Sequence, residues 1–426
     1  MAYAHGISLI EESTALTVMT TAESPCVAIG TASKGTTLTP VLIQSMDEFE
    51  SAFGFTGDFD ANTLEEVAYA FFTLYNVRPV IFIRVAPATG ATTVTNAQII
   101  SAIAVVEEIY PRLSMVPGNI IAPKYSAVPE VALALAAKAK NINGIFKSFA
   151  VADISLPTNL LSEENPTADR AIDGKAIARG DLLTEKAIVR GNLLTDDAAN
   201  DADYTLVNAY KNTNSLTDEY LAECWPRVAL GDKSYWLSTQ AAALMALVDA
   251  NHGQIPYESP SNKNLRADRS LVKSGAAVFL SYANANVLNS QGVVTTMNFN
   301  GWRLYGNRTS TYPTNDDPAV SFIATRRMRN WLGNTLAINY FSRIDSPLNR
   351  RLVDTILDEV NLFLNGLTAQ GVLLGGRISF LEEDNSVTDL ADGLMKFRIY
   401  YAAPPPARSI SFVLSYDVSY FQTLFS

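Results

Sequence analysis

The chain has few of the residues that carry most enzyme and metal chemistry. Its 426 residues include two histidines and two cysteines. A Ser-His-Asp triad would have to use His5, near the amino terminus, or His252, in a turn, and neither lies in a nucleophile elbow. Cys26 and Cys224 show no metal-ligand spacing, and we expect two buried free thiols. These absences argue against an enzyme and against a metal or cofactor site.

Long apolar runs and an excess of basic residues are also missing. No stretch approaches the roughly eighteen consecutive apolar residues of a membrane span, and residues 1–10 do not read as a signal peptide. The net charge of −11 argues against nucleic acid as the main partner. We therefore expect a protein made in a cytoplasm, with no membrane insertion and no export by a general signal.

The charge is distributed unevenly along the chain. Residues 1–75 carry ten acids and one Lys, whereas six arginines lie between residues 326 and 351 beside the single acid Asp345. Such a cluster is typical of a solvated face or of internal pairing, and the alternative is a docking surface for an acidic partner. The six are Arg326, Arg327, Arg329, Arg343, Arg350 and Arg351.

The first half alternates between short apolar strands and helices. We predict strands at 27–29, 80–85, 120–121 and 146–154, and helices at 62–75, 129–140 and 239–250. Repeated βα units predict an α/β layer with a largely parallel sheet. The loop after the first strand is not a phosphate loop, because Lys34 precedes Gly35 instead of following it. An α/β enzyme that uses the strand-end loops stays the alternative from another class.

Residues 158–203 interrupt this alternation. They hold a tandem repeat of eleven residues, KAIARGDLLTE at 175–185 and KAIVRGNLLTD at 186–196. Two copies are too few for a solenoid, and Gly followed by Asp or Asn favours tight turns. We predict a small exposed hairpin insertion.

The second half reads as an α+β domain. Ser346 and Pro347 predict a helix start, and an apolar stripe from Leu348 to Leu367 continues to Gly371. A strand at 395–401 precedes Pro404-Pro405-Pro406. Beyond these prolines, apolar residues occupy every even position of 409–420, which predicts a long strand with one buried face. Its apolar face consists of Ile410, Phe412, Leu414, Tyr416, Val418 and Tyr420.

Three further segments of the chain are distinctive: residues 258–263 (ESPSNK), residues 301–309 (GWRLYGNRT) followed by 322–327 (FIATRR), and Arg398-Ile399-Tyr400 before the prolines and the terminal strand. In this order, they are similar to segments of the sheath proteins of contractile phage tails and R-type pyocins. The His5-Gly6 pair and the Gly30 loop, with the nearby Phe49 and Phe53-Gly54, also resemble that family. Tyr305 stands where the family pattern leads us to expect Trp, and residues 158–203 have no counterpart.

The resemblance implies an inner α+β domain built from both chain ends, with strand-donating arms, and an inserted outer α/β domain. It places an amino-terminal arm and the first part of the inner domain at 1–22 and the outer domain at 23–265. The inner domain then covers 266–403, and a carboxy-terminal arm covers 404–426.

The implied function is that of a sheath subunit, which polymerises in stacked hexameric rings around an inner tube and contracts to drive the tube through a target envelope. The implied partners are further copies, the tail tube protein, and baseplate and tail terminator proteins. The implied location is a virion tail or tailocin particle assembled in the bacterial host cytoplasm. The six arginines become possible tube contacts. A non-contractile filament or shell protein with the same arms is the structural alternative.

Overall fold

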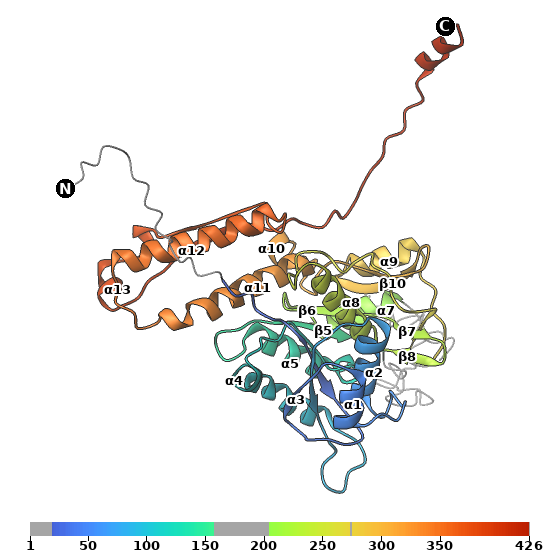
Figure 1. The fold of residues 1–426 in the computed structure, drawn as a ribbon. Helices are drawn as coiled ribbons and strands as arrows, with labels where there is room; N and C mark the ends of the chain where they lie inside the picture. Colours follow the sequence, from blue (N-terminus) through green and yellow to red (C-terminus); the bar gives the residue numbers. More distant parts are fainter. Residues whose placement is uncertain (1–18, 157–203, 273–274, 426) are drawn as a thin grey trace, which may run out of the picture.

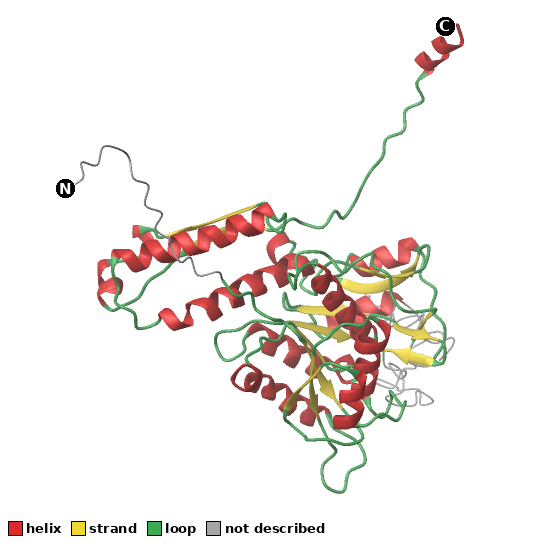
Figure 2. Ribbon diagram, viewed as in Figure 1, coloured by secondary structure: helices red, strands yellow, loops and turns green. Residues whose placement is uncertain are grey.

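An eight-stranded sheet runs through the described part of the chain, which in the computed structural model comprises residues 19–156, 204–272 and 275–425 (Figures 1 and 2). Its order is β11-β10-β6-β5-β4-β1-β3-β2, parallel in the centre, with the antiparallel strands β2 and β11 at the edges. The predicted parallel α/β layer is confirmed. The strands are β1 (Cys26–Gly30), β2 (Pro40–Ile43), β3 (Val80–Arg84), β4 (Asn119–Ile121), β5 (Phe149–Asp153), β6 (Leu221–Cys224), β10 (Val293–Asn298) and β11 (Trp302–Tyr305).

Helices cover both faces of this sheet because its strands are apolar on both sides. In β1, Cys26 and Ala28 join one core while Val27 and Ile29 join the other. The first core is closed by α1 (Met46–Phe53), α2 (Thr63–Ala68), a π-helical turn over Tyr69–Leu74, and α8 (Leu237–Asn251). The second is closed by α3 (Asn96–Ala104), α4 (Ile109–Leu113) and α5 (Pro129–Lys140).

A smaller antiparallel sheet lies beside this layer, in the order β8-β7-β9. Trp225, just before β7, packs with Val207 and Leu288 from two helices in a separate core. The elements of this region are α7 (Tyr204–Thr213), β7 (Arg227–Leu230), β8 (Lys233–Tyr235), β9 (Arg269–Leu271) and α9 (Tyr282–Asn289). The short helix α10 (Pro318–Ser321) lies beside the start of the long helix that follows it in the chain.

Two long helices form a separate layer, to which both described ends of the chain lead (Figure 1). Trp331 of the first helix and Ile356 of the second share one apolar core with Ile378 of a two-stranded sheet. The elements are α11 (Ile323–Tyr340), α12 (Arg350–Ala369), β12 (Gly375–Ser379), α13 (Val387–Ala391) and β13 (Arg398–Ala402). No helix in the described ranges combines the length and apolarity that crossing a membrane requires.

The second long helix begins later than the sequence predicts. Asn349, not Ser346, is its cap, and the Asn349 carboxamide oxygen accepts the Leu352 N–H at 2.9 Å. Asn accepts this bond as well as Ser does, so the Ser-Pro signal was wrong by one turn. The apolar stripe is confirmed from Leu352 onward, whereas Leu348 lies outside the helix and is exposed.

The large sheet extends beyond the boundary expected at residue 265. Strands β10 and β11 follow that residue, and β10 pairs in parallel with β6 through Val293 and Glu223. Apolar periodicity does not predict this strand, because Thr295 and Thr296 are polar although both are buried in it. The division at 265 therefore runs through one sheet, and the domain limits stay a prediction. The predicted hairpin at 158–203 and His5 lie outside the described residues.

Candidate assembly surfaces

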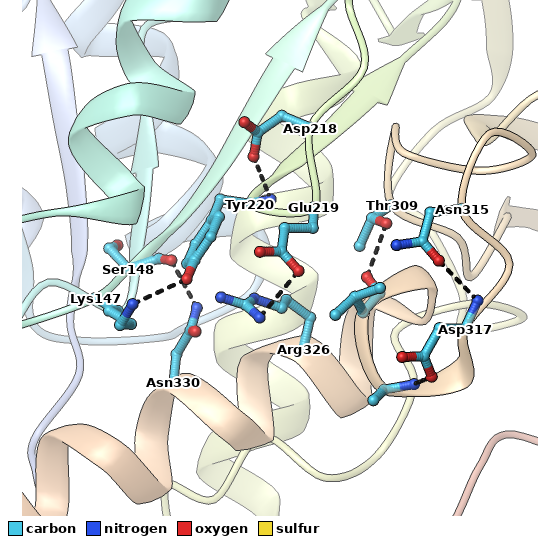
Figure 3. Close-up of polar contacts among 12 residues, drawn as sticks. Lys147, Ser148, Asp218, Glu219, Tyr220, Thr309, Asn315, Asp317, Arg326 and Asn330 are labelled. Carbon is cyan, nitrogen blue, oxygen red and sulfur yellow. Dashed lines mark hydrogen bonds and ion pairs between the residues drawn. The ribbon is translucent and has the colours of Figure 1, made fainter.

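Arg326 fastens the start of α11 to the sheet layer (Figure 3). Its Nη1 donates to Glu219 Oε2 at 3.2 Å, and its guanidinium lies 3.7 Å from the centre of the Tyr220 ring. The side chain is 3% exposed. Burial lowers the pKa of Arg326, while Tyr220 and Glu219 raise it. Arg326 thus makes an internal contact, which is stabilised by a carboxylate and by the face of an aromatic ring.

Arg327, in the same turn of α11, makes a second contact with the sheet layer. Its guanidinium pairs with both carboxylate oxygens of Asp249, at the end of α8, and its Nε donates to Asn119 at 3.2 Å. This side chain is 5% exposed. One turn further along, Asn330 Nδ2 donates to the Ser148 carbonyl at 2.7 Å. A buried bidentate pair of this kind is strongly directional, so it fixes the angle at which the helix leaves the sheet.

Burial therefore corrects the expectation that Arg326 and Arg327 contact a tube. Both are closed in by groups of this chain and offer no surface to a partner. The sequence signal was ambiguous, because Arg327, Asn330 and Asn334 are spaced like a wet helix face. Their partners in the sheet layer are 78 to 208 residues away in sequence. The contacts with these partners bury this face of the helix.

The other four arginines are accessible but do not form one cluster. Arg343 lies 3.4 Å from Glu359, and Arg350 pairs with Asp354 at 2.9 Å while staying 87% exposed. Arg351 is exposed in the same first turn of α12, and Arg329 is exposed on α11. A role in tube contact stays a prediction for these four.

The segment after the three prolines extends away from the rest of the molecule (Figure 1). Phe412 is 86% and Leu414 95% exposed, and Ile410 and Tyr416 are also exposed. No strand pairing is present at 409–417, and residues Val418–Phe425 form a 3₁₀-helix. Val418 and Tyr420, predicted as the end of the strand, are therefore helical here. A row of exposed apolar side chains is unfavourable in water without a partner, so an intersubunit role for this arm stays a prediction.

A two-stranded sheet with two open edges lies at the base of this arm. Strands β12 and β13 pair antiparallel from Gly375–Ala402 to Ser379–Arg398. Ile399 faces the core of the helical layer, whereas Arg377 stacks over the Tyr400 ring at 4.5 Å on the other side. Each strand of this pair has one edge that pairs with no described strand, although on β12 the Ile378 N–H donates to Asn361 Oδ1 at 3.1 Å. Such edges accept added strands.

The first described residues join the same layer. The Thr20 N–H donates to Asn339 Oδ1 at 3.0 Å, and Asn339 Nδ2 donates back to the Thr20 carbonyl at 2.8 Å. Met19 packs on the core of this layer. Segments more than 300 residues apart in sequence therefore meet on α11.

The buried acids of the sheet layer lie apart from these surfaces. Glu66, Asp153 and Glu223 are fully or nearly fully buried, and burial raises the pKa of each. Asp153 Oδ1 accepts the Ser238 N–H at 2.9 Å, which ties β5 to the start of α8. The described residues hold no group of His, Cys, Asp or Glu suited to a metal ion. His252 pairs with Glu258 at 2.8 Å, and the cysteines are buried and free as expected.

Comparison with known sequences points to one class of relatives, although no protein-family model matches the chain. The chain is 30% identical over 224 residues to the tail sheath protein of Burkholderia phage BcepMu, which covers 50% of this chain and 46% of the relative. It is 26% identical over 215 residues to the tail sheath protein of Escherichia phage P2, covering 48% of this chain and 52% of the relative. The chain thus matches about half the length of these curated relatives.

Solved structures match over nearly the whole chain. The sheath of an extracellular contractile injection system, PVC, in its contracted state has a TM-score of 0.65 at 15% identity and covers 99% of both chains. The contracted helical sheath of the anti-feeding prophage has a TM-score of 0.64 at 14% identity, over 98% of this chain and all of the other. The fold is that of contractile sheath subunits.

The resemblance to tail sheath proteins expected from the sequence is confirmed by both comparisons. The sheath proteins among these relatives are structural proteins and not enzymes, and they belong to phage tails or to extracellular injection particles.

Proposed function

We propose that the chain is the structural sheath subunit of a contractile tail or injection machine. It polymerises around an inner tube through exchanged strands and contracts to drive that tube through the target cell envelope. The observation that carries this proposal is the exposed apolar arm, which stands beside a sheet with open edges in a chain that folds like contractile sheaths.

The arm of one copy adds to the β12–β13 sheet of another. Residues 410–416 supply alternating apolar side chains, and β12 and β13 each supply an edge with no described strand beside it. The edge of β13 is the more open one, because the Ile378 N–H of β12 already donates to Asn361 Oδ1. Each backbone hydrogen bond of an added strand contributes about 1 kcal/mol net, and each large apolar side chain about 2 kcal/mol. A contact of this kind keeps subunits linked while rigid bodies rotate past one another.

The finer architecture follows the same proposal. The inner domain is built from both chain ends, which the contact of Thr20 with α11 supports, and the sheet layer is the inserted outer domain. The arginine pairs of α11 join the two so that a load on the inner layer moves the outer layer with it. Arg329, Arg343, Arg350 and Arg351 are the possible tube contacts.

The assembly consists of stacked hexameric rings in a helical sheath, with the tail tube, baseplate and terminator proteins as partners. The particle is a phage tail or a tailocin assembled in the bacterial host cytoplasm, without nucleic acid or membrane insertion as a role of this subunit. A static filament or shell with the same arms is the second candidate, and electron microscopy of tubes formed with and without an inner tube distinguishes them by their diameter.

Removal of the arm tests the proposal. A chain lacking residues 408–426 keeps every described core, so we expect it to fold and stay dispersed where the full chain forms tubes. Circular dichroism checks the fold, and sedimentation with electron microscopy checks the polymer. Tubes formed by the truncated chain would contradict the donated-strand role.

A further inference from the structure

A groove beside the base of the arm has no role in strand exchange. It measures about 750 Å³ and lies between the segment 257–263, helix α9, the end of β11 and residues 404–409. Tyrosine rings dominate it: Tyr282 and Tyr305 lie 6.2 Å apart between ring centres, and Tyr305 OH donates to Asn286 at 3.2 Å. Tyr282 is 66% exposed. Pro404–Pro406 form one wall, so each groove adjoins the root of its own arm.

The charge of the groove is positive. Glu258 is matched by Lys263, but Arg308 and Arg408 form no ion pair among the described residues. The Arg308 guanidinium lies 3.7 Å from the centre of the Phe322 ring, and its Nε is buried without a hydrogen-bond partner. Burial lowers the pKa of Arg308 and so does the neighbouring Arg408, whereas Tyr312 and the carboxylate of Asp316 raise it. Two guanidinium groups that form no described ion pair, beside tyrosine rings, suit an aromatic segment that carries a negative charge.

The last described part of the arm has this chemistry. Asp417 is the only charged residue in 409–425, and its carboxylate accepts the Ser419 N–H at 2.9 Å where the 3₁₀-helix begins. We call Asp417–Phe425 the tip. Tyr420 is exposed, and Phe421 packs only on Tyr416, at 6.2 Å, among the described rings. The tip has no contact with the sheet layer of its own chain (Figure 1).

We propose that the tip of one copy docks in this groove of a second copy, with its aromatic rings against the groove tyrosines and Asp417 facing Arg308 and Arg408. This inference rests on the proposed function and adds a second attachment point to the arm, outside the β12–β13 sheet. The occupant comes from another copy because the stiff proline wall directs each arm away from its own groove. In this arrangement, the tip of one arm binds next to residues 404–409 of a second copy, where the arm of that second copy begins.

Cross-linking between copies tests this docking in the full chain. One population carries Tyr282→Cys and the other Tyr420→Cys, and the native cysteines are buried. A short bis-maleimide added to mixed tubes should give a covalent dimer. Phe412→Cys in place of Tyr420→Cys is the matched control on the strand part of the same arm, and we expect at least fivefold less dimer from it. Arg408→Glu should lower the yield at least fivefold, and Asp417→Lys should restore it.

The outcomes separate the two proposals. Tubes that form without the Tyr282–Tyr420 dimer, or with equal dimer from the Phe412 control, overturn the docking and leave the sheath function intact. A link within one chain in dilute protein carrying both substitutions also overturns it. A wild-type chain that forms no tubes contradicts the sheath function itself.

Discussion

At the residue scale, charged groups of this chain serve two opposite purposes. Arg326 and Arg327 are buried and held by Glu219 and Asp249, so they act within the subunit. Arg350 is exposed and its pair with Asp354 is a surface pair, which contributes little to stability. The sequence alone shows how many arginines there are, but it does not show which of them are buried. Burial depends on partners that are distant in the chain.

Charge reversal at two exposed arginines tests the tube contact. In the double variant Arg350→Glu, Arg351→Glu, we expect a stable subunit with weaker assembly on purified tubes, because an acidic tube surface would repel the new carboxylates. Co-sedimentation with tubes measures the effect, which we expect to be at least fivefold at low salt. Arg112→Glu is the control, since Arg112 forms a similar surface pair with Glu108 in the sheet layer. Unchanged assembly of the double variant would contradict the contact.

A second residue prediction concerns Glu223, whose carboxylate is buried in β6 with both oxygens unpartnered. Burial raises its pKa from 4.5 to about 8, with Lys211 lowering it and Asp153 raising it. The folded state therefore favours the protonated acid, and its contribution to stability is present below about pH 4.5 and lost as pH rises to about 8.

Glu223→Gln removes the titrating carboxyl group, so the variant does not lose stability through ionisation at this position as the pH rises. The free energy of unfolding of the variant, relative to wild type, should increase by a few kcal/mol between pH 5 and pH 8. Lys211, whose pKa is lowered to about 8, stays largely protonated through most of that window, so the difference reports Glu223. Urea unfolding at several pH values measures it. A difference that does not change with pH would show that Glu223 does not titrate as described.

At the element scale, alternation and helical stripes were sufficient to locate most of the fold. The strands at 27–29, 80–85 and 120–121 and the helix at 129–140 match β1, β3, β4 and α5. The antiparallel pair β10–β11 was not predicted, because β10 buries the polar residues Thr295 and Thr296 and so lacks an apolar pattern. The arm was predicted as a strand, and it pairs with no strand among the described residues.

The arm should tolerate substitution on one face only. Phe412→Asp with Leu414→Asp places two charges on the face that contacts the acceptor sheet, and we expect the concentration needed for polymerisation to rise at least tenfold. Ser411→Asp with Ser415→Asp adds the same charge to the opposite face of the same segment and should change it little. Light scattering over a concentration series measures both. Equal loss in the two variants would contradict a one-faced strand.

At the scale of the whole molecule, a two-layer body carries an arm that pairs with no described strand. The joint between α11 and the sheet is sealed by buried ion pairs, whereas the arm has no described contact with that body beyond its root (Figure 1). The resemblance to sheath proteins predicted a folded body with a strand-donating arm. Periodicity alone predicts the strand but not the subunit whose sheet the strand joins. Only the assembled polymer contains that information.

The most direct test of the central claim is a cryo-electron microscopy map of tubes formed by the full chain. We predict continuous strand density for residues 410–416 paired with β12 or β13 of another copy. An arm that folds back onto the sheet of its own chain, or that stays unpaired in well-ordered tubes, would contradict the account.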